Sequence, residues 1–359
     1  MKKLFVLIAV ASVFVACKER SEGRPDDRFP AAVQMSRLGG LDVPEDSLGV
    51  VEWMACEGGN LIAFDLHSGA CYTLFDAGTG AYVGRFGTIG QGPAEIPAGC
   101  YGYLSGKRFS VFNDQVKFVM QYSMDSLRNG HADASPKRLA SYDIPDLQLS
   151  RLIALNDSLF LGAGLYQSHY QYVLFDRHSR VMDKAVPVYN ASDDAFNFST
   201  RYLANQGDLV KHPRKDKFAY SLNFSSNLDF FEIDDGKLAV IRQLHWGDPD
   251  YRPSEMDLGN GYVGFSADLT ENSIVGYINL AATSRYVYAL YSDKKVYESA
   301  RKSKEVLVFD WDGNPVRRYA LDADAYSIAV DETSGKLFAA IVKEDTGEWD
   351  IVCYPLNEA

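Results

Sequence analysis

The chain has 359 residues, of which 47% are hydrophobic and 13% aromatic, and its formal net charge at pH 7 is −12. A surface this acidic repels nucleic acid and anionic lipid headgroups, so the charge excludes both as partners of a folded part. The many aromatic residues, the 29 glycines and the lack of a long helical period are typical of an all-β protein.

The first residues have the pattern of a secretory signal. Lys2 and Lys3 precede an apolar run from Leu4 to Ala16. A run of 13 residues is too short to span a bilayer, which needs about 20 apolar residues. It fits the apolar region of a signal peptide that ends in a small residue. The sequence therefore predicts a signal peptide over residues 1–16.

The end of that run resembles a bacterial lipobox, in which a cysteine is acylated and becomes the mature N-terminus. Ala16 is followed by Cys17, although Phe14 stands where leucine is usual. An ordinary secretory signal is the alternative. Residues 17–28 then form a lipidated cysteine and a charged stretch, "KERSEGRPDDR", which is expected to be a flexible tether. Membrane attachment would depend on the acyl chains alone.

Four cysteines remain beyond the predicted lipid attachment site: Cys56, Cys71, Cys100 and Cys353. In an oxidising compartment they can form two bridges in three ways. They make neither a dense framework nor a C-x-x-C pair, so free thiols buried in strands are the favoured interpretation.

A short phrase recurs along the chain: an apolar run, then Asp, a few polar residues and Gly. It appears as "LIAFDLHSG", "YTLFDAGTG", "YVLFDRHSR", "FFEIDDGK", "VLVFDWDGN" and "SIAVDETSG". Each copy predicts a strand that ends in a hairpin, with the aspartate capping the turn and the glycine or its substitute in the left-handed conformation.

The spacing of these hairpins predicts the fold. The hairpins that precede an outer strand begin about 50 residues apart, and the later intervals are longer. They are marked by Asp76, Asp125, Asp176, Asp234 and Asp310. A step of this size is one four-stranded propeller blade. The sequence therefore predicts an all-β protein: a six-bladed β-propeller of four-stranded antiparallel blades over residues 29–359.

The sixth blade shows only three strands in the sequence. Its missing strand is expected from the N-terminal residues 29–38, "FPAAVQMSRL", paired beside the strand of Cys353. Such pairing of the two chain ends would close the ring and remove two open sheet edges.

A glycine-rich segment, "GRFGTIGQGPAEI" at residues 84–96, is expected to carry the chain from the outer strand of blade one to the inner strand of blade two. Gly87, Gly90 and Gly92 are expected to supply positive φ angles there. Neither the Rossmann nor the Walker glycine spacing is present, so a phosphate-binding loop is excluded.

This segment resembles the G-x-G-P-x-E signature of TolB-like six-bladed propeller lipoproteins of the Gram-negative envelope. "SRYVYALYSDK" and "VLVFDWDGNPVRRYALDADAYSIAVDETSGKLFAAI" are similar to the later blades of that group, and the likeness runs from about Gly49 to Leu356. Ala94 departs from the pattern, where glycine is common. The resemblance implies a lipid-anchored envelope propeller and supplies no established activity.

No catalytic or metal-binding motif stands out, and no cofactor is predicted. Loops between second and third strands and between blades share one face of a propeller, near the axial channel. Tyrosines there offer flat apolar surface with a hydroxyl group, which suits sugars or peptides. The candidate binding residues are Gln91, Glu95, Tyr101, Tyr166, Arg201, Tyr202, Tyr251, Tyr262, Lys294, Lys295 and Arg301.

The sequence thus favours a non-enzymatic binding or scaffolding protein for an envelope protein, peptide or glycan. A hydrolase or lyase acting at the channel mouth is the alternative, and a purely structural envelope protein is a third. The basic stretch from Lys294 to Lys304 is either an anion-binding or partner-docking loop or a solvated insertion.

Overall fold

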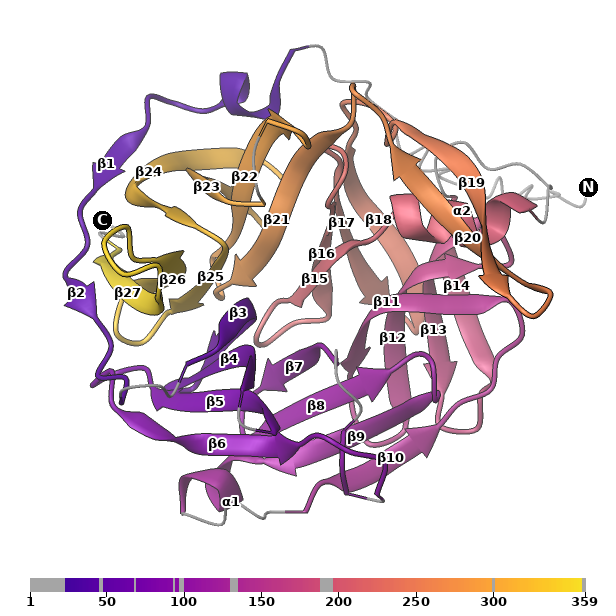
Figure 1. The fold of residues 1–359 in the computed structure, drawn as a ribbon, viewed down its shortest axis with the longest axis horizontal. Coiled ribbons are helices and arrows are strands. Elements are labelled where there is room, and N and C mark those ends of the chain that lie inside the picture. Colours follow the sequence, from indigo (N-terminus) through magenta and orange to yellow (C-terminus); the bar gives the residue numbers. More distant parts are fainter. Residues whose placement is uncertain are drawn as a thin grey trace, which may run out of the picture.

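The computed structural model describes residues 23–44, 48–67, 69–92, 94–96, 100–129, 135–187, 196–298 and 301–356. Six β-sheets stand around a central axis and form a closed ring (Figure 1). The prediction of an all-β, six-bladed propeller is confirmed. In these residues no helix is both long and apolar enough to cross a membrane. The predicted signal peptide and Cys17 lie outside the described residues.

Blades one to three each have four antiparallel strands, and their order in the sheet is their order in the chain, starting from the axis (Figure 1). Their strands are β3 (Val50–Glu57), β4 (Asn60–His67), β5 (Ala70–Asp76) and β6 (Tyr82–Thr88); β7 (Gly102–Ser105), β8 (Arg108–Asn113), β9 (Phe118–Ser123) and β10 (Lys137–Ser141); and β11 (Leu147–Ala154), β12 (Leu159–Tyr166), β13 (Tyr170–Asp176) and β14 (Val181–Pro187).

Blades four to six follow the same plan, and the N-terminal strands join the last two. Their strands are β15 (Gly207–Lys211), β16 (Lys217–Leu222), β17 (Leu228–Asp234) and β18 (Lys237–Leu244); β21 (Ile274–Ala282), β22 (Tyr286–Lys295), β23 (Ser303–Asp310) and β24 (Pro315–Ala325) with β1 (Val33–Met35); and β25 (Ser327–Asp331), β26 (Lys336–Val342) and β27 (Trp349–Pro355) with β2 (Gly39–Gly40).

The core consists of the layers between neighbouring blades. Strand β26 shows how alternation builds two layers from one strand. Leu337, Ala339 and Ile341 pack toward blade five, whereas Phe338 and Ala340 pack toward blade one. Burying one large apolar side chain contributes roughly 1.5–3 kcal/mol. Because both faces of such strands are covered, their sequences read as continuous apolar runs.

Three of the recurring aspartates, Asp76, Asp176 and Asp310, cap the hairpins between third and fourth strands, as predicted. Asp310 accepts a hydrogen bond from the Asn314 backbone N–H at 2.8 Å, and Gly313 has φ +77°. Asp76 and Asp176 make equivalent bonds in their own turns. The side chain satisfies backbone groups that a tight turn leaves unpaired. For the copy "LIAFDLHSG" the prediction is wrong, because Asp65 is buried within β4 and accepts from the Thr73 hydroxyl at 2.8 Å instead of capping the turn.

Asp125 marks the same connection in blade two, but there the chain forms a short helix instead of a hairpin turn. Helix α1 (Met124–Arg128) follows β9, with Ser123 as its N-cap accepting from the Ser126 N–H at 3.4 Å. Met124 and Leu127 of this helix are buried.

The two chain ends pair and close the ring, as predicted, but through a later segment than expected. Gly39 of β2 pairs with Cys353 of β27, and the Leu38 N–H donates to the Cys353 carbonyl at 2.8 Å. A glycine fits beside β27 because a Cβ at Gly40 would lie 3.0 Å from a carboxylate oxygen of Asp350.

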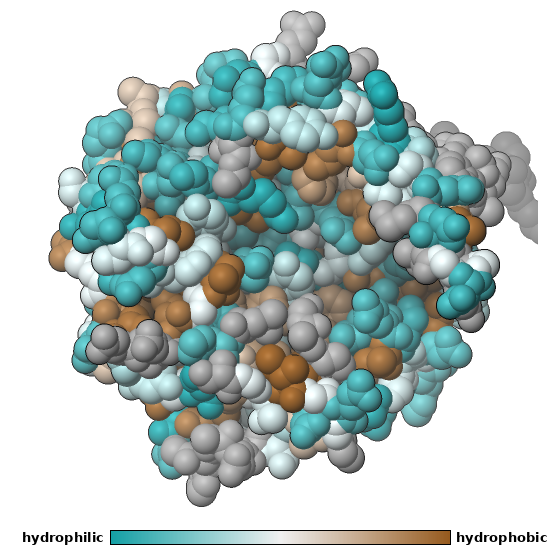
Figure 2. Space-filling view, in the orientation of Figure 1, coloured by the Kyte–Doolittle hydropathy of each residue, from teal (hydrophilic) through white to brown (hydrophobic). Residues whose placement is uncertain are grey.

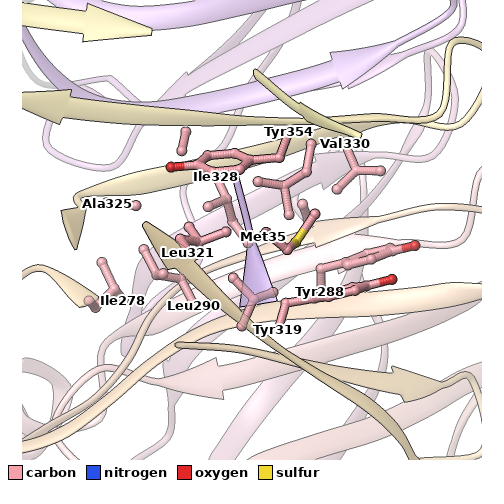
Figure 3. Close-up of a cluster of buried hydrophobic side chains, with 14 of the residues drawn as sticks. Met35, Ile278, Tyr288, Leu290, Tyr319, Leu321, Ala325, Ile328, Val330 and Tyr354 are labelled. Carbon is pink, nitrogen blue, oxygen red and sulfur yellow. The ribbon is translucent and has the colours of Figure 1, made fainter. Parts of the chain in front are cut away.

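Most of the segment expected to pair with β27 lies on blade five instead. Strand β1 runs parallel to β24, at the outer edge of that blade (Figure 1). Val33 and Gln34 are exposed, whereas Met35 enters the layer between blades five and six, near Leu321 and Tyr354 (Figure 3). Met35 is the one apolar anchor of the strand, which explains its position.

Residues at the end of the predicted tether also lie against the ring. They form the 3₁₀ turn η1 (Pro25–Arg28), in which Pro25 is buried. Just before it, Arg24 pairs with Asp293 at 2.9 Å. The guanidinium of Arg28 lies 5.5 Å from the centre of the Trp246 ring.

The glycine-rich segment turns the chain from blade one to blade two, as expected, but its glycines act differently from the prediction. Gly87 has φ +77°, whereas Gly90 and Gly92 are outside the left-handed region. They leave room for Glu95, whose carboxylate accepts from the Gly92 N–H at 2.7 Å. A Cβ at Gly90 would overlap that carboxylate.

Two additions stand outside the blade plan. Helix α2 (Phe196–Ala204) precedes blade four, and a separate hairpin of β19 (Tyr251–Gly259) and β20 (Tyr262–Leu269) precedes blade five. The helix packs against the hairpin, and both lie at one side of the ring (Figure 1).

Candidate functional site

A cavity of about 240 Å³ opens at the axis of the ring, which is hollowed at its centre (Figure 2). Blades one, two, three, five and six contribute to it, mostly through their innermost strands. This cavity, called the mouth pocket below, is lined by Val50, Val51, Glu52, Trp53, Tyr101, Arg151, Ile278, Asn279, Arg301, Tyr326 and Trp349.

Arg151 of β11 is the most constrained charged group of the mouth pocket. Its Nε donates to Asp208 of β15 at 2.8 Å, and its Nη1 donates to the Ser150 carbonyl at 2.8 Å. The guanidinium carbon lies 3.8 Å from the centre of the Tyr101 ring. Nη2 has no hydrogen-bond partner among the described residues. The guanidinium is therefore held rigidly by Nε and Nη1, and its Nη2 is available to a ligand.

Asp208 joins three blades through one carboxylate. Besides accepting from Arg151, it accepts from the backbone N–H of Leu280 in β21 at 2.8 Å. Burial lowers the pKa of the Arg151 guanidinium, but the Asp208 charge more than offsets this and the pKa lies above its ordinary value. The Arg151 guanidinium is therefore positively charged at neutral pH.

Asn279 continues this connection to blade six. Its side-chain amide donates to the Ile328 carbonyl at 2.9 Å and accepts from the Ile328 N–H at 3.0 Å. The innermost strands β11, β15, β21 and β25 are thus tied in sequence by side chains. We call Arg151, Asp208 and Asn279 the polar belt. These bonds satisfy polar groups that would otherwise destabilise the buried axis.

Aromatic side chains form another part of the wall. The rings of Tyr326 and Trp349 have their centres 4.8 Å apart and are tilted by 58°. Both are half-buried, so part of each remains accessible. Trp53 is buried and lines the mouth pocket from blade one.

Two exposed charges complete the mouth pocket. Arg301 lies in the connection between β22 and β23 and has no ion-pair partner among the described residues. Glu52 comes from β3 and is the lining carboxylate. With Arg151, the lining has two positive groups and one negative group, and the buried Asp208 behind it pairs with Arg151.

A second and smaller cavity of about 60 Å³, the floor cavity, lies farther along the same strands. Trp53 lines both cavities, while Leu209, Leu280 and Val330 line only the floor cavity. It is mostly apolar, although Glu57 and Lys211 stand at its edge.

Two of the sequence-predicted candidates, Tyr101 and Arg301, line the mouth pocket together. Gln91 is exposed in the glycine-rich loop, and Glu95 is bonded within that loop. Lys294 is exposed at the end of β22.

The neighbouring Lys295 bonds to the Asn272 carbonyl at 3.0 Å. The basic stretch is therefore divided: Arg301 reaches the mouth pocket, whereas Lys302 pairs with Asp324 at 3.3 Å.

Three other candidates, Arg201, Tyr202 and Tyr251, gather around helix α2. Arg201 is 1% exposed and donates to the Ser168 carbonyl at 2.7 Å. Burial raises the pKa of Tyr251, with an opposing hydrogen bond from Arg201. The Tyr202 hydroxyl donates to the Leu149 carbonyl at 3.0 Å.

The remaining two candidates are tyrosines in strands. Tyr166 is buried at the end of β12, and Tyr262 begins β20. The contacts of Arg201, Tyr202 and Tyr251 connect helix α2 to blade three and to the β19–β20 hairpin. These three side chains therefore hold the helix in position.

Sequence reasoning missed Glu52, Trp53, Tyr326 and Trp349, and it missed the polar belt. The belt did leave a signal. Arg151 in "LQLSRLIA", Asp208 in "GDLVK" and Asn279 in "GYINLAA" are polar residues inside strands that are otherwise largely apolar. A buried strand carries such residues only when they are paired.

The described residues contain no group of three or more His, Cys, Asp or Glu side chains that could hold a metal ion. Cys56, Cys71, Cys100 and Cys353 are all free. Burial raises the pKa of the Cys71 thiol to about 12 and that of Cys100 to about 11. Both are therefore protonated at neutral pH.

The family described as TolB-like 6-blade propeller-like matches residues 53–333. Two solved structures share the fold at low sequence identity. A Bacteroides fragilis protein described as exported has a TM-score of 0.55 and 13% identity, over 94% of this chain and 97% of that chain. A DUF4221 family member from Bacteroides vulgatus has a TM-score of 0.52 and 11% identity, over 89% and 96%. No match is found among the curated proteins.

Proposed function

Since the chain belongs to the TolB-like six-bladed propeller family, we propose that it is a lipid-anchored envelope protein that binds a partner at its mouth pocket without transforming it. The partner is a glycan, a peptide or a protein segment. The mouth pocket carries this proposal, because five blades fix cationic, anionic and aromatic groups around one concave site.

The bonding within the site supports binding rather than catalysis. Asp208 and Asn279 are both used to hold strands together, which leaves Glu52 as the lining carboxylate. Glycoside hydrolysis ordinarily uses two carboxylates that flank the bond. The groups present can position a ligand, and the rigid ring lowers the cost of ordering them.

The lipid anchor rests on Cys17 and the preceding signal-like run. The B. fragilis protein that shares the fold and is described as exported agrees with an envelope location. In cells fed a labelled fatty acid, the full chain should incorporate label and the Cys17→Ser variant should not. Equal labelling of the two chains would contradict the anchor.

Binding can be tested with the full chain purified in detergent and screened against envelope glycans, peptides and proteins. We expect at least one ligand whose binding is weakened by Arg301→Ala. Arg177→Ala is the matched control, because Arg177 is an exposed arginine in the turn between β13 and β14. Failure to bind any of these, together with turnover of a model glycoside or ester, would favour the hydrolase or lyase instead.

A further inference from the structure

We propose that the mouth pocket recognises a sugar unit that carries one carboxylate, of the hexuronate type, at the end of a glycan. This deepens the proposed function and rests on it. The argument depends on Nη2 of Arg151 and on Arg301, neither of which has a partner among the described residues, together with the aromatic wall and the charge balance of the site.

The carboxylate is the group that the two arginines suit best. Arg151 has Nε and Nη1 occupied, so Nη2 is the donor left to a ligand. Its orientation is fixed by Asp208 and by the Tyr101 ring. Arg301 supplies a second guanidinium from another blade. Charge-assisted bonds from arginine to carboxylate are among the stronger hydrogen bonds in proteins.

The charge balance favours one carboxylate over a polyanion. Arg151 and Arg301 are the positive groups of the lining and Glu52 is its negative group, while the charge of Arg151 is already paired with the buried Asp208, in a protein whose net charge is −12. A ligand with several negative groups would be repelled by this acidic protein, and the mouth pocket has no surplus of cationic side chains to offset the repulsion. A single carboxylate needs only the two directed donors.

The other walls suit a sugar ring. Tyr326 and Trp349 offer flat apolar surface, on which the C–H face of a pyranose can pack. Glu52 can accept from sugar hydroxyls, as an ionised carboxylate has only acceptor sites. The mouth pocket therefore matches the three faces of an acidic sugar: carboxylate, hydroxyl rim and apolar side.

The shape of the mouth pocket favours the end of a glycan chain over its middle. The polar belt disfavours a peptide that would bind as an added β-strand. Trp53 lines both the mouth pocket and the floor cavity, and the floor cavity is small and mostly apolar, so a polar glycan has little room to continue past the mouth pocket. A peptide would pair with the free edge of an innermost strand. At Leu280 and Ile328, however, that edge is already bonded to Asp208 and Asn279.

The test is titration calorimetry on the full chain with a glucuronate-terminated oligosaccharide, its glucose-terminated counterpart and a peptide with a free C-terminal carboxylate. We expect the acidic sugar to bind and both other probes to bind at least about tenfold more weakly. Arg301→Gln should weaken the acidic sugar by about ten- to a hundredfold, the usual effect of losing a charge-assisted hydrogen bond.

Two further variants separate recognition from folding. Arg151→Lys keeps a positive charge beside Asp208 but lacks the free guanidinium edge, so it should also weaken the acidic sugar. Arg177→Gln should leave its affinity unchanged. Thermal unfolding of each variant reports whether the ring is intact.

Equal affinity for the neutral and acidic sugars, or no effect of Arg301→Gln, would overturn the carboxylate assignment. Tighter binding of the peptide, weakened by Arg301→Gln, would replace the sugar by a peptide terminus and leave the proposed binding function standing. If the three probes fail but the wider screen finds a ligand sensitive to Arg301→Ala, the sugar is wrong and the binding function survives. If neither the calorimetry nor the wider screen finds a ligand, both the sugar assignment and the proposed binding function are wrong.

Discussion

The mouth pocket and the floor cavity share strands β3 and β21 but differ in chemistry. In β15, Asp208 belongs to the polar belt, and the next residue, Leu209, lines the floor cavity. In β21, Asn279 lines the mouth pocket and Leu280 the floor cavity. One step along an innermost strand therefore separates a recognition surface from ordinary apolar packing.

This difference shows how a propeller can keep a polar mouth without weakening its ring. Buried polar groups are costly unless paired, and here each belt residue bonds to a neighbouring strand. The same side chains that make the mouth polar also hold blades together. The floor cavity is mostly apolar, so its lining side chains contribute to stability chiefly through burial.

The largest expected effect on stability comes from a substitution in the polar belt. Asp208→Ala should lower the free energy of unfolding by about 3–5 kcal/mol, because it leaves the largely buried Arg151 charge and the Leu280 N–H without their partner. Urea unfolding measures the change. Asp157→Ala is the control, since Asp157 pairs with Lys137 in an exposed ion pair and should cost about 1 kcal/mol or less. Equal losses in the two variants would refute a structural role for the belt.

At the floor, Leu209→Ala should lower the free energy of unfolding by about 2–5 kcal/mol, as expected for enlarging a cavity in an apolar core. Ligand affinity at the mouth pocket should stay unchanged, which calorimetry can check. A loss of affinity comparable to that of Arg301→Gln would show that the floor cavity and the mouth pocket do not act independently.

A smaller effect is expected from Asn279→Ala, which leaves both backbone groups of Ile328 without the side chain that bonds them. An unsatisfied buried group costs about 1–3 kcal/mol. The unfolding midpoint in urea should fall with little change in the slope of the transition. If stability is unaltered, the tie between β21 and β25 does not contribute.

The smallest expected effect depends on pH and concerns His212, beside the floor. Its Nδ1 accepts from the Arg214 and Lys215 N–H groups at 3.0 and 3.1 Å. Burial, with the charges of Lys215 and Lys211, lowers the pKa of His212 below its ordinary value. The unfolded chain then binds more protons below about pH 6.5.

The His212 contribution to stability is therefore present above about pH 6.5 and is lost as the pH falls. His212→Asn keeps an acceptor for the turn but does not titrate. Melting temperatures measured from pH 8 to pH 5 should fall less steeply for this variant than for the parent chain. Identical profiles would show that His212 does not contribute to the pH dependence.

The sequence predicted the blades well because their signals are local. The hairpin at Asp310, for instance, depends on an aspartate and a nearby glycine, whose conformational preferences are the same in any fold. The position of the closing strand was less accessible. Whether residues 29–38 or Gly39–Gly40 pair with β27 depends on long-range contacts such as that between Met35 and the layer of blades five and six.

The mouth pocket could be predicted only in part. Tyr101 and Arg301 were found because they lie in loops that a propeller places at the mouth. Arg151 and Asn279 lie within strands, and their role depends on which strands become neighbours. A polar residue in an innermost strand is thus a stronger indicator in this fold than a tyrosine in a long loop.

The pairing of β1 and β2 with the last two blades also sets an order of events for a newly made chain. Residues 33–40 are synthesised near the beginning, but their partners in β24 and β27 are synthesised near the end. The ring therefore stays open until almost the entire chain has emerged, and contacts this distant in sequence form slowly. Residues 33–40 are already present when blades five and six emerge, so they can cover the outer edges of these blades as they form and guard them against premature association.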